Sequence, residues 1–382
     1  MRTTRAYICT MHRIRKLLLI LLAITFLTIL SHIWYRIPTL QPSGLREPTP
    51  ISLHPHYPPP TRLLNITNFE FIANPSVCDP KDKILGVILV HSHPSNIDLR
   101  QAARDHISKR LLNEIGIRRV FLIGEAIRAQ PKYPAVKQEI ISKENGEHQD
   151  LIQGNFVEHY RNLTYKHIMG LTWTVHYCPQ AEFIIKVDDD IAVDIFQIRQ
   201  LIKYKYRNIR NQMLGLIQVE QSPLRSNASK WMVTEEEFSG KTYPSFLSGW
   251  CYIAPKETIQ RIVSVAHKFP YFWIDDVLVT GIIAEELGIE REGLNNKYTI
   301  HSAHMRCCAD EHYYPLRYYC DYFAGPTGGD HMLLASALDQ FHNCYRKGCK
   351  SRTGQQTIAR TCVATPKDMP TGRGVGEVIA IA

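Results

Sequence analysis

The chain has 382 residues, enough for one large or two ordinary domains, and its apolar content of 45% and charged content of 21% are typical of a globular protein. The formal net charge is +9, but five positive charges lie before residue 17, which leaves only +4 for the rest. A balance this small argues against nucleic acid as a partner.

The first predicted element is an uncleaved membrane anchor over residues 17–35. This stretch carries no Asp, Glu, Lys or Arg, and as a helix it would span roughly 28 Å, close to the hydrocarbon thickness of a thin bilayer. The basic residues of the tail 1–16 favour a cytosolic N-terminus and a lumenal remainder. A cleaved signal peptide is the alternative, but the apolar run is long for one and no A-x-A-like cleavage site follows.

The lumenal part is predicted to comprise a stem over 36–77, a catalytic domain over 78–362 and a tail over 363–382. Eight prolines lie between residues 36 and 63, which indicates an extended stem. Every cysteine except Cys9 would be lumenal, where most should pair, and the odd number, nine, leaves at least one unpaired. The connectivity stays open. Three sequons predict N-glycosylation, at Asn65, Asn162 and Asn227.

Short apolar runs alternate with helical patterns from residue 84 onward. The expected strands are 84–90, 120–123 and 183–187, and the expected helices are 97–115, 149–177 and 195–206. This alternation predicts an α/β fold with a doubly wound sheet. Ligands in such folds bind beyond the carboxyl ends of the strands.

Three adjacent aspartates, Asp188, Asp189 and Asp190, follow the third predicted strand. Adjacent carboxylates repel one another, and a divalent cation relieves that repulsion. In an extended turn, the first and third can point the same way and offer oxygens to Mg²⁺ or Mn²⁺. The alternatives are a solvated acidic turn or a helix cap, for which Asp194 is also placed.

A second carboxylate pair, Asp275 and Asp276, precedes a helical pattern over 278–287. Its functional interpretation is a general base at a helix start, and its alternative is simple capping of that helix.

An aromatic stretch runs from Tyr243 to Tyr252 around Gly249. Gly249 would let the backbone approach a sugar ring, on which Trp250 or Tyr252 could stack. The alternative is an ordinary aromatic turn in the core.

Together these motifs resemble the β1,3-glycosyltransferase family, which includes β1,3-galactosyltransferases, β1,3-N-acetylglucosaminyltransferases and Fringe-like enzymes. The resemblance covers roughly residues 84–345. It is carried, in order, by Arg100 and Arg104 in R-x-A-x-R, Arg119–Gly124, the block from Glu144 through Asp150 to Lys166, Trp173, Cys178, Lys186–Asp190, Lys230–Trp231, Tyr243–Pro244, Ser248–Gly249 and Asp276–Val277.

The resemblance implies a single catalytic domain of the GT-A type, using a UDP-sugar and Mn²⁺ (or Mg²⁺), with inversion at the anomeric carbon. Asp190 would hold the metal and Asp276 would be the catalytic base. The residues expected near the donor are Arg100, Arg104, Asp150, Lys186, Asp188 and Asp189, although ion pairing is the alternative role of the two arginines. Those expected around the acceptor or sugar are Tyr243, Gly249, Trp250 and Asp275.

The sequence departs from the family pattern at three places. Asp275 stands where the family has Glu, and Trp250-Cys251 replaces a pair of small residues. The late histidine that completes the family's metal shell falls at Gly325, so His301, His304, His331 or a water would have to substitute.

The expected function is an inverting hexosyltransferase that moves galactose from UDP-galactose to a hydroxyl of a glycoprotein or glycolipid glycan in a β1,3 linkage. The expected location is the Golgi membrane, as a single-pass type II protein. The alternatives are a UDP-N-acetylglucosamine-dependent transferase and an inactive relative that serves as a Golgi binding partner.

Overall fold

The computed structural model describes Thr25, Thr28 and residues 61–126, 134–227, 229–309 and 318–364. The chain divides into two units, Met1–Ser52 and Leu53–Ala382. The predicted anchor over 17–35 lies outside the described residues except for the two threonines, as do residues 36–60 and 365–382. Within the described ranges, no helix has the length and apolar character needed to cross a membrane.

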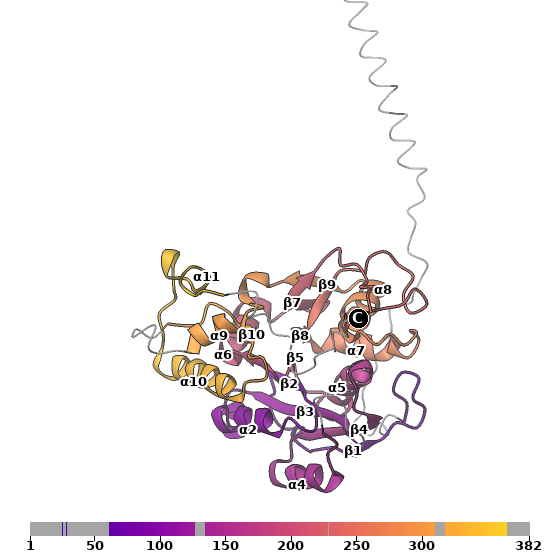
Figure 1. Ribbon diagram of the computed structural model, residues 1–382, viewed down its shortest axis with the longest axis horizontal. Helices are drawn as coiled ribbons and strands as arrows, with labels where there is room; N and C mark the ends of the chain where they lie inside the picture. Colours follow the sequence, from indigo (N-terminus) through magenta and orange to yellow (C-terminus); the bar gives the residue numbers. More distant parts are fainter. Residues whose placement is uncertain are drawn as a thin grey trace, which may run out of the picture. The chain divides into compact units, whose positions relative to one another are not determined.

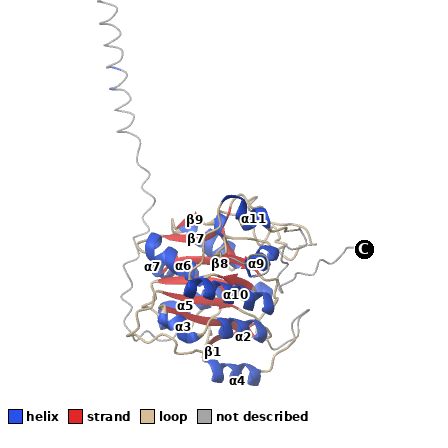
Figure 2. Ribbon diagram, turned by 90° about the vertical axis from the view of Figure 1, so that its left-hand side faces the viewer, coloured by secondary structure: helices blue, strands red, loops and turns tan. Residues whose placement is uncertain are grey.

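One mixed sheet of eight strands, in the order β1-β4-β3-β2-β5-β8-β7-β9, forms the centre of the second unit (Figure 2). β4, β3, β2 and β5 are parallel, whereas β1 and β8 pair antiparallel with β4 and β5. A separate ladder joins β6 to β10. The strands are β1 (Phe71–Ala73), β2 (Gly86–His91), β3 (Ile117–Glu125), β4 (Leu151–Val157), β5 (Phe183–Asp188), β6 (Ile191–Val193), β7 (Gln212–Gln218), β8 (Phe246–Pro255), β9 (Glu290–Gly293) and β10 (Ala324–Pro326).

Helices cover both faces of the sheet (Figure 1). On one face the core includes residues of α2 (Ile97–His106), α6 (Ile195–Leu201), α9 (Ser302–Ala309) and α10 (His331–Lys347). On the other it includes residues of α5 (Leu163–Tyr177) and α7 (Lys256–Ala266). All of β2 is buried because both faces are covered. The remaining α-helices are α3 (Lys109–Glu114), α4 (Gln138–His148), α8 (Ala284–Glu286) and α11 (Ile358–Thr361).

The predicted α/β class is confirmed, and the three predicted strands correspond to β2, β3 and β5. The predicted helix over 149–177 is wrong in its first half, because residues 151–157 form β4, with Leu151 paired to Phe121 of β3. The short apolar run fits a buried parallel strand, and helix α5 begins only at Leu163. The predicted helix over 97–115 is two helices, the second capped where Ser108 Oγ accepts from Leu111 N at 3.2 Å.

The packed domain begins earlier than the predicted boundary at residue 78. Leu63 and Phe69, which were assigned to the stem 36–77, are each 1% exposed and belong to the core. Their burial corrects the stem boundary to a position before residue 63.

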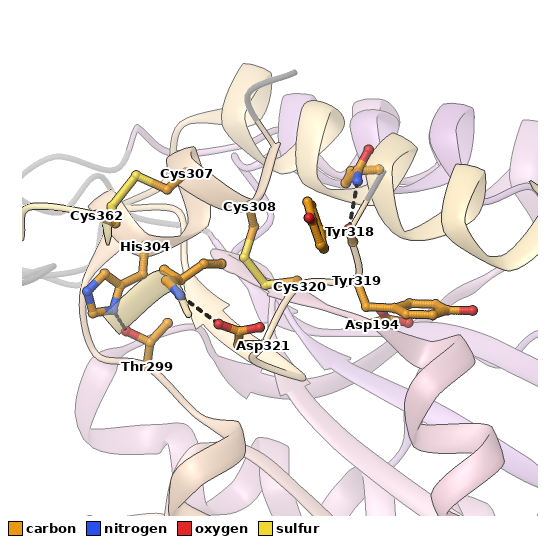
Figure 3. Close-up of a disulfide and its surroundings, with 12 residues drawn as sticks. Asp194, Thr299, His304, Cys307, Cys308, Tyr318, Tyr319, Cys320, Asp321 and Cys362 are labelled. Atoms are coloured by element: carbon orange, nitrogen blue, oxygen red, sulfur yellow. Dashed lines mark hydrogen bonds between the residues drawn. A yellow bond between two sulfur atoms is a disulfide. The ribbon is translucent and has the colours of Figure 1, made fainter. Parts of the chain in front are cut away.

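Four disulfides link described residues of the second unit, and they confirm the prediction that most cysteines after Cys9 pair. They join Cys78 to Cys178, Cys307 to Cys362, Cys308 to Cys320 and Cys344 to Cys349. The second and third leave neighbouring positions of α9 and fasten it to two later segments (Figure 3). Among the described cysteines, Cys251 of β8 is free and buried.

Candidate functional site

The three aspartates at the end of β5 have different partners. Asp188 Oδ1 accepts a hydrogen bond from Lys186 Nζ at 2.5 Å. Asp189 Oδ2 turns to the loop between β2 and α2, where it accepts from Ser92 Oγ at 2.7 Å and Asn96 Nδ2 at 3.0 Å. The Asp189 carboxylate therefore holds that loop, and the direct donor contact expected of it stays a prediction.

Asp190 is fixed through its backbone. Its carbonyl oxygen accepts from both N and Oγ1 of Thr327, each at 2.8 Å. Burial, followed by the charges of Asp189 and Asp188, raises the pKa of the Asp190 carboxyl to about 7. A bound cation would relieve this crowding, so the residue fits the predicted ligand role. No three His, Cys, Asp or Glu within the described ranges are grouped to hold a metal ion, so substrate oxygens or water would have to complete its shell.

Gly325, where the late histidine would fall, lies in β10 at a position with no room for a side chain. A Cβ at this position would lie 2.6 Å from Thr299 Cγ2 and 2.8 Å from Met305 Cε, closer than real contacts allow. Of the predicted substitutes, His304 already shares a hydrogen bond of 2.7 Å with Thr299 Oγ1 (Figure 3).

Asp276 stands directly before the π-helical segment η3 (Val277–Ile283), and backbone N–H groups hold both of its carboxylate oxygens. Val277 N donates to Oδ1 at 2.8 Å, and Gly249 N donates to Oδ2 at 2.9 Å. The capping alternative is therefore confirmed as one role of Asp276. Burial first, and the charge of Asp275 second, raise its pKa to about 7. A carboxyl with this pKa can exchange a proton near neutral pH.

Asp275 faces a different partner from its neighbour. Its Oδ2 lies 2.8 Å from Nδ1 of His167, a fully buried residue of α5. Burial opposes ionisation, but the hydrogen bond from His167 and the charge of Lys186 outweigh it and keep the pKa of Asp275 below its ordinary value. The two adjacent carboxyls therefore differ in protonation behaviour, and Asp276 is the more basic.

Lys186 links the two acidic segments. Its side chain is 2% exposed, and the charges of Asp188, Asp275 and Asp276 outweigh burial and raise its pKa. Burial, and then the charges of the same three carboxylates, raise the pKa of Tyr160. Aspartates of both acidic motifs thus act through their charges on one ammonium group.

The predicted donor residues Arg100, Arg104 and Asp150 form a buried ion network with Glu144. Arg100 is 0% exposed, and its donors bind Glu144, Ser92 Oγ and two carbonyls of the β2–α2 loop. Arg104 donates to both oxygens of Asp150, at 2.9 and 2.7 Å, and to Glu144. The ion-pair alternative is therefore confirmed for the two arginines, and direct contact with the donor stays a prediction. Arg100 is linked to the acidic site through Ser92, whose Oγ donates to Asp189.

Gly249 of the aromatic segment supports Asp276, and the acceptor or sugar contact expected of this segment stays a prediction. A Cβ on Gly249 would lie 2.9 Å from Asp276 Cβ, so the glycine makes room for that carboxylate. Tyr243 packs against Phe238 at 4.9 Å between ring centroids, which matches the core alternative. The Trp250 ring lies edge-on to Tyr298 at 5.3 Å.

The sequence reasoning missed His167, Tyr252, Tyr160, Ser92 and Asn96 as site residues, although it considered Tyr252 for stacking. One signal was available: Lys166 and His167 interrupt an otherwise apolar stretch of α5, and both are buried. Lys166 Nζ donates to the Ser92 carbonyl and to Glu158, each at 2.6 Å.

The three sequons differ in accessibility. Asn65 and Asn227 are exposed, whereas Asn162 is half-buried and its Nδ2 donates to the Val157 carbonyl at 2.8 Å. Thr164 of that sequon is fully buried. Glycosylation at all three stays a prediction.

Comparison with known proteins identifies the family. The sequence model of the galactosyltransferase family matches residues 99–295. Beta-1,3-galactosyltransferase 5 of Homo sapiens is 30% identical over 221 residues, which cover 58% of this chain and 69% of that protein. Beta-1,3-galactosyltransferase 2 of Mus musculus is 30% identical over 229 residues, which cover 59% and 53%. A solved glycosyltransferase involved in glycosylation of the major capsid of PBCV-1 aligns with 66% of this chain and 98% of its own, at 9% identity and a TM-score of 0.31, too weak a likeness to carry an argument. The chain belongs to the galactosyltransferase family, as one of its β1,3-glycosyltransferases.

Proposed function

We propose that the chain is an inverting GT-A type hexosyltransferase that moves galactose from UDP-galactose to a glycan hydroxyl in a β1,3 linkage. The observation that carries this proposal is Asp276, whose carboxylate is held by Gly249 N and Val277 N and has a pKa near 7. Similarity to the human and mouse beta-1,3-galactosyltransferases supports galactose as the sugar.

Asp276 acts as the base in the proposed reaction. A sugar hydroxyl is a weak nucleophile, and Asp276 takes its proton as the new bond to the anomeric carbon forms. In the same displacement the bond between that carbon and the UDP oxygen breaks, so the carbon is inverted and UDP leaves with the bonding electrons on its diphosphate. Lys186 pairs with Asp188, and its charge helps to keep the pKa of Asp275 below its ordinary value. The divalent cation, held by Asp190, supplies neutralisation of the diphosphate charge when it is bound.

The test uses the full chain with Mn²⁺, UDP-galactose or UDP-N-acetylglucosamine, and a panel of glycan acceptors, with the product linkage determined by NMR. We expect galactose transfer in a β1,3 linkage. Asp276→Asn should slow transfer by about 10² to 10⁴-fold without weakening UDP binding. Asp275→Asn should cost less, since asparagine still accepts the hydrogen bond from His167.

Each contrary result has its own meaning. Preference for UDP-N-acetylglucosamine would overturn the proposed donor. Metal-dependent UDP binding without transfer from any UDP-sugar would favour the inactive relative. A greater loss of rate in Asp275→Asn than in Asp276→Asn would overturn the assignment of the base.

We also propose that the protein is a Golgi membrane enzyme with its catalytic domain in the lumen. The disulfides support an oxidising compartment. A C-terminal tag should resist protease in sealed microsomes and become sensitive after detergent. Digestion of the tag without detergent would contradict this topology.

A further inference from the structure

A buried histidine stands behind the carboxylate pair, in a position that the proposed chemistry does not use. His167 is 0% exposed and lies in the middle of α5. Its Nδ1 is 2.8 Å from Asp275 Oδ2, and its Nε2 is 2.6 Å from the Tyr252 hydroxyl. Three separate elements, α5, β8 and the segment before η3, thus meet at one imidazole.

The partners define which nitrogen of His167 carries the proton. An ionised carboxylate only accepts hydrogen bonds, so Nδ1 must donate to Asp275. Nε2 is then free to accept from the Tyr252 O–H. Burial lowers the pKa of His167 despite its aspartate partner, so the ring stays neutral in this one tautomer. Both ends of the ring are satisfied, which a different tautomer would not allow.

We propose that His167, with Tyr252 behind it, is a positioning residue for the transfer reaction, because it fixes the ionised Asp275 carboxylate in one orientation and leaves Asp276 as the only proton acceptor of the pair. This inference rests on the proposed function of Asp276. Without the Nδ1–H donor, Asp275 would be a buried carboxylate with no donor from α5 and would compete with Asp276 for a proton.

Other groups also act on Asp276. Burial raises its pKa directly, and the Gly249 and Val277 N–H groups oppose that rise together with Lys186. The titratable and charged groups around the pair include Lys186 and Asp188 of β5, His167 of α5, Tyr160 of the short 3-10 helix η1 (Tyr160–Asn162), Tyr252 of β8, Tyr243 of the loop before β8, and Tyr271.

The first experiment compares the pH dependence of transfer by the full chain in His167→Phe and His167→Asn. Phenylalanine removes both hydrogen bonds, whereas the asparagine amide can replace the Nδ1–H donor. In His167→Phe, Asp275 binds a proton more readily and its charge no longer acts on Asp276. The acidic limb of the plot of transfer rate against pH should therefore shift to lower pH by about one unit. The plateau of the transfer rate should be about tenfold lower, because Asp276 is a weaker base.

His167→Asn should keep the acidic limb of the wild type. UDP affinity with Mn²⁺ should change less than about twofold in both variants, since neither touches Asp190. A purely structural role predicts instead that rate falls in step with melting temperature, without a shift of the limb. An unshifted limb in a folded His167→Phe, or an equal shift in His167→Asn, would overturn the proposal.

The second experiment needs neither turnover nor a folded phenylalanine variant. Histidine side chains of the full chain, labelled with ¹⁵N, are observed by NMR between about pH 7 and 9, above the ordinary histidine pKa of about 6.5, and His167 is identified by the signal lost in His167→Asn. We expect a neutral ring with the proton on Nδ1 across this range. A ring that becomes protonated within it, or that carries its proton on Nε2, overturns the proposal. The NMR signal of His167 does not depend on transferase activity. Lack of activity in the same protein would therefore count against the proposed function and not against the protonation state of His167.

Discussion

Gly249→Ala offers a direct test of how Asp276 is held. The added Cβ would lie 2.9 Å from Asp276 Cβ and 3.3 Å from both Cγ and Oδ2. Carbon atoms pack at about 3.5 to 4.0 Å, so the carboxylate must move by roughly half an ångström or more. The movement also weakens the bond of 2.9 Å from Gly249 N to Oδ2.

Two contributions set the expected loss of stability in Gly249→Ala. Overpacking of this kind costs about 1 to 3 kcal/mol, and a hydrogen bond to a charged group contributes about 1.5 to 3 kcal/mol. Because relaxation relieves part of both, we expect a loss of about 2 to 4 kcal/mol in the free energy of unfolding. A misplaced base should also lower the transfer rate by about 10²-fold.

The assay measures urea unfolding, transfer rate at saturating substrates, and UDP affinity with Mn²⁺. UDP affinity should stay near that of the wild type, since Asp190 is untouched. Gly146→Ala is the matched control, because a Cβ there meets nothing within 4 Å and alanine favours helix α4 by about 1 kcal/mol. If Gly249→Ala keeps the wild-type rate and stability, the glycine is not required for the position of Asp276.

Three further predictions concern the metal ligand, the buried network and pH. Asp190→Ala should abolish the Mn²⁺ dependence of UDP binding while the melting curve stays cooperative; an unchanged Mn²⁺ dependence would rule it out as the ligand. Arg100→Met removes the buried guanidinium that donates to Glu144 and Ser92, leaves Glu144 with Arg104 as its remaining ion-pair partner, and should cost about 3 to 5 kcal/mol of unfolding free energy, whereas Arg110→Ala, at an exposed pair, should cost less than about 1 kcal/mol; similar losses would refute the assignment of Arg100 to a buried ion pair. The pKa of Asp276 rises on folding from 3.8 to about 7, so the folded protein binds this proton more tightly, and its contribution to stability is lost as the pH rises through about 7. Asp276→Asn should therefore gain stability relative to wild type between pH 5 and pH 8 in the absence of ligands, as melting temperatures would report, and a constant difference between the two proteins would contradict this sign.

The parts of the site that were predictable from sequence are local. The aspartate turn directly follows a run of apolar residues, and β5 ends within that turn at Asp188. Because the carboxyl end of a buried strand and its next few residues are fixed by the strand itself, a short pattern was enough to locate Asp190 at the sheet edge. The same holds for Asp276, which caps the segment that follows it.

The parts that were missed depend on pairing between distant residues. His167 lies 108 positions from Asp275, and no local pattern relates them. Arg104 and Asp150, 46 positions apart, were both expected near the donor, with ion pairing as the alternative for Arg104, and the fold buries them against each other. Neither hydropathy nor spacing distinguishes an arginine that binds a substrate from one that is buried in an ion pair. β4 was misassigned for a related reason. Its short apolar run is compatible with a helix or a strand, and its pairing with β3, which is distant in sequence, makes it a strand.

In the ligand-free site, burial and mutual repulsion of the carboxyl groups destabilise their ionised forms. Asp190 and Asp276 both have pKa values raised to about 7, chiefly by burial and then by neighbouring carboxylates. Both are attached to rigid elements, since the Asp190 carbonyl is bonded to Thr327 and Asp276 to the backbone of β8. A change of charge at either carboxyl would relieve the repulsion. A divalent cation held by Asp190 would supply that change there, and in the proposed reaction the proton of the acceptor hydroxyl supplies it at Asp276. The same burial that destabilises the empty site therefore favours binding of the cation and transfer of the proton.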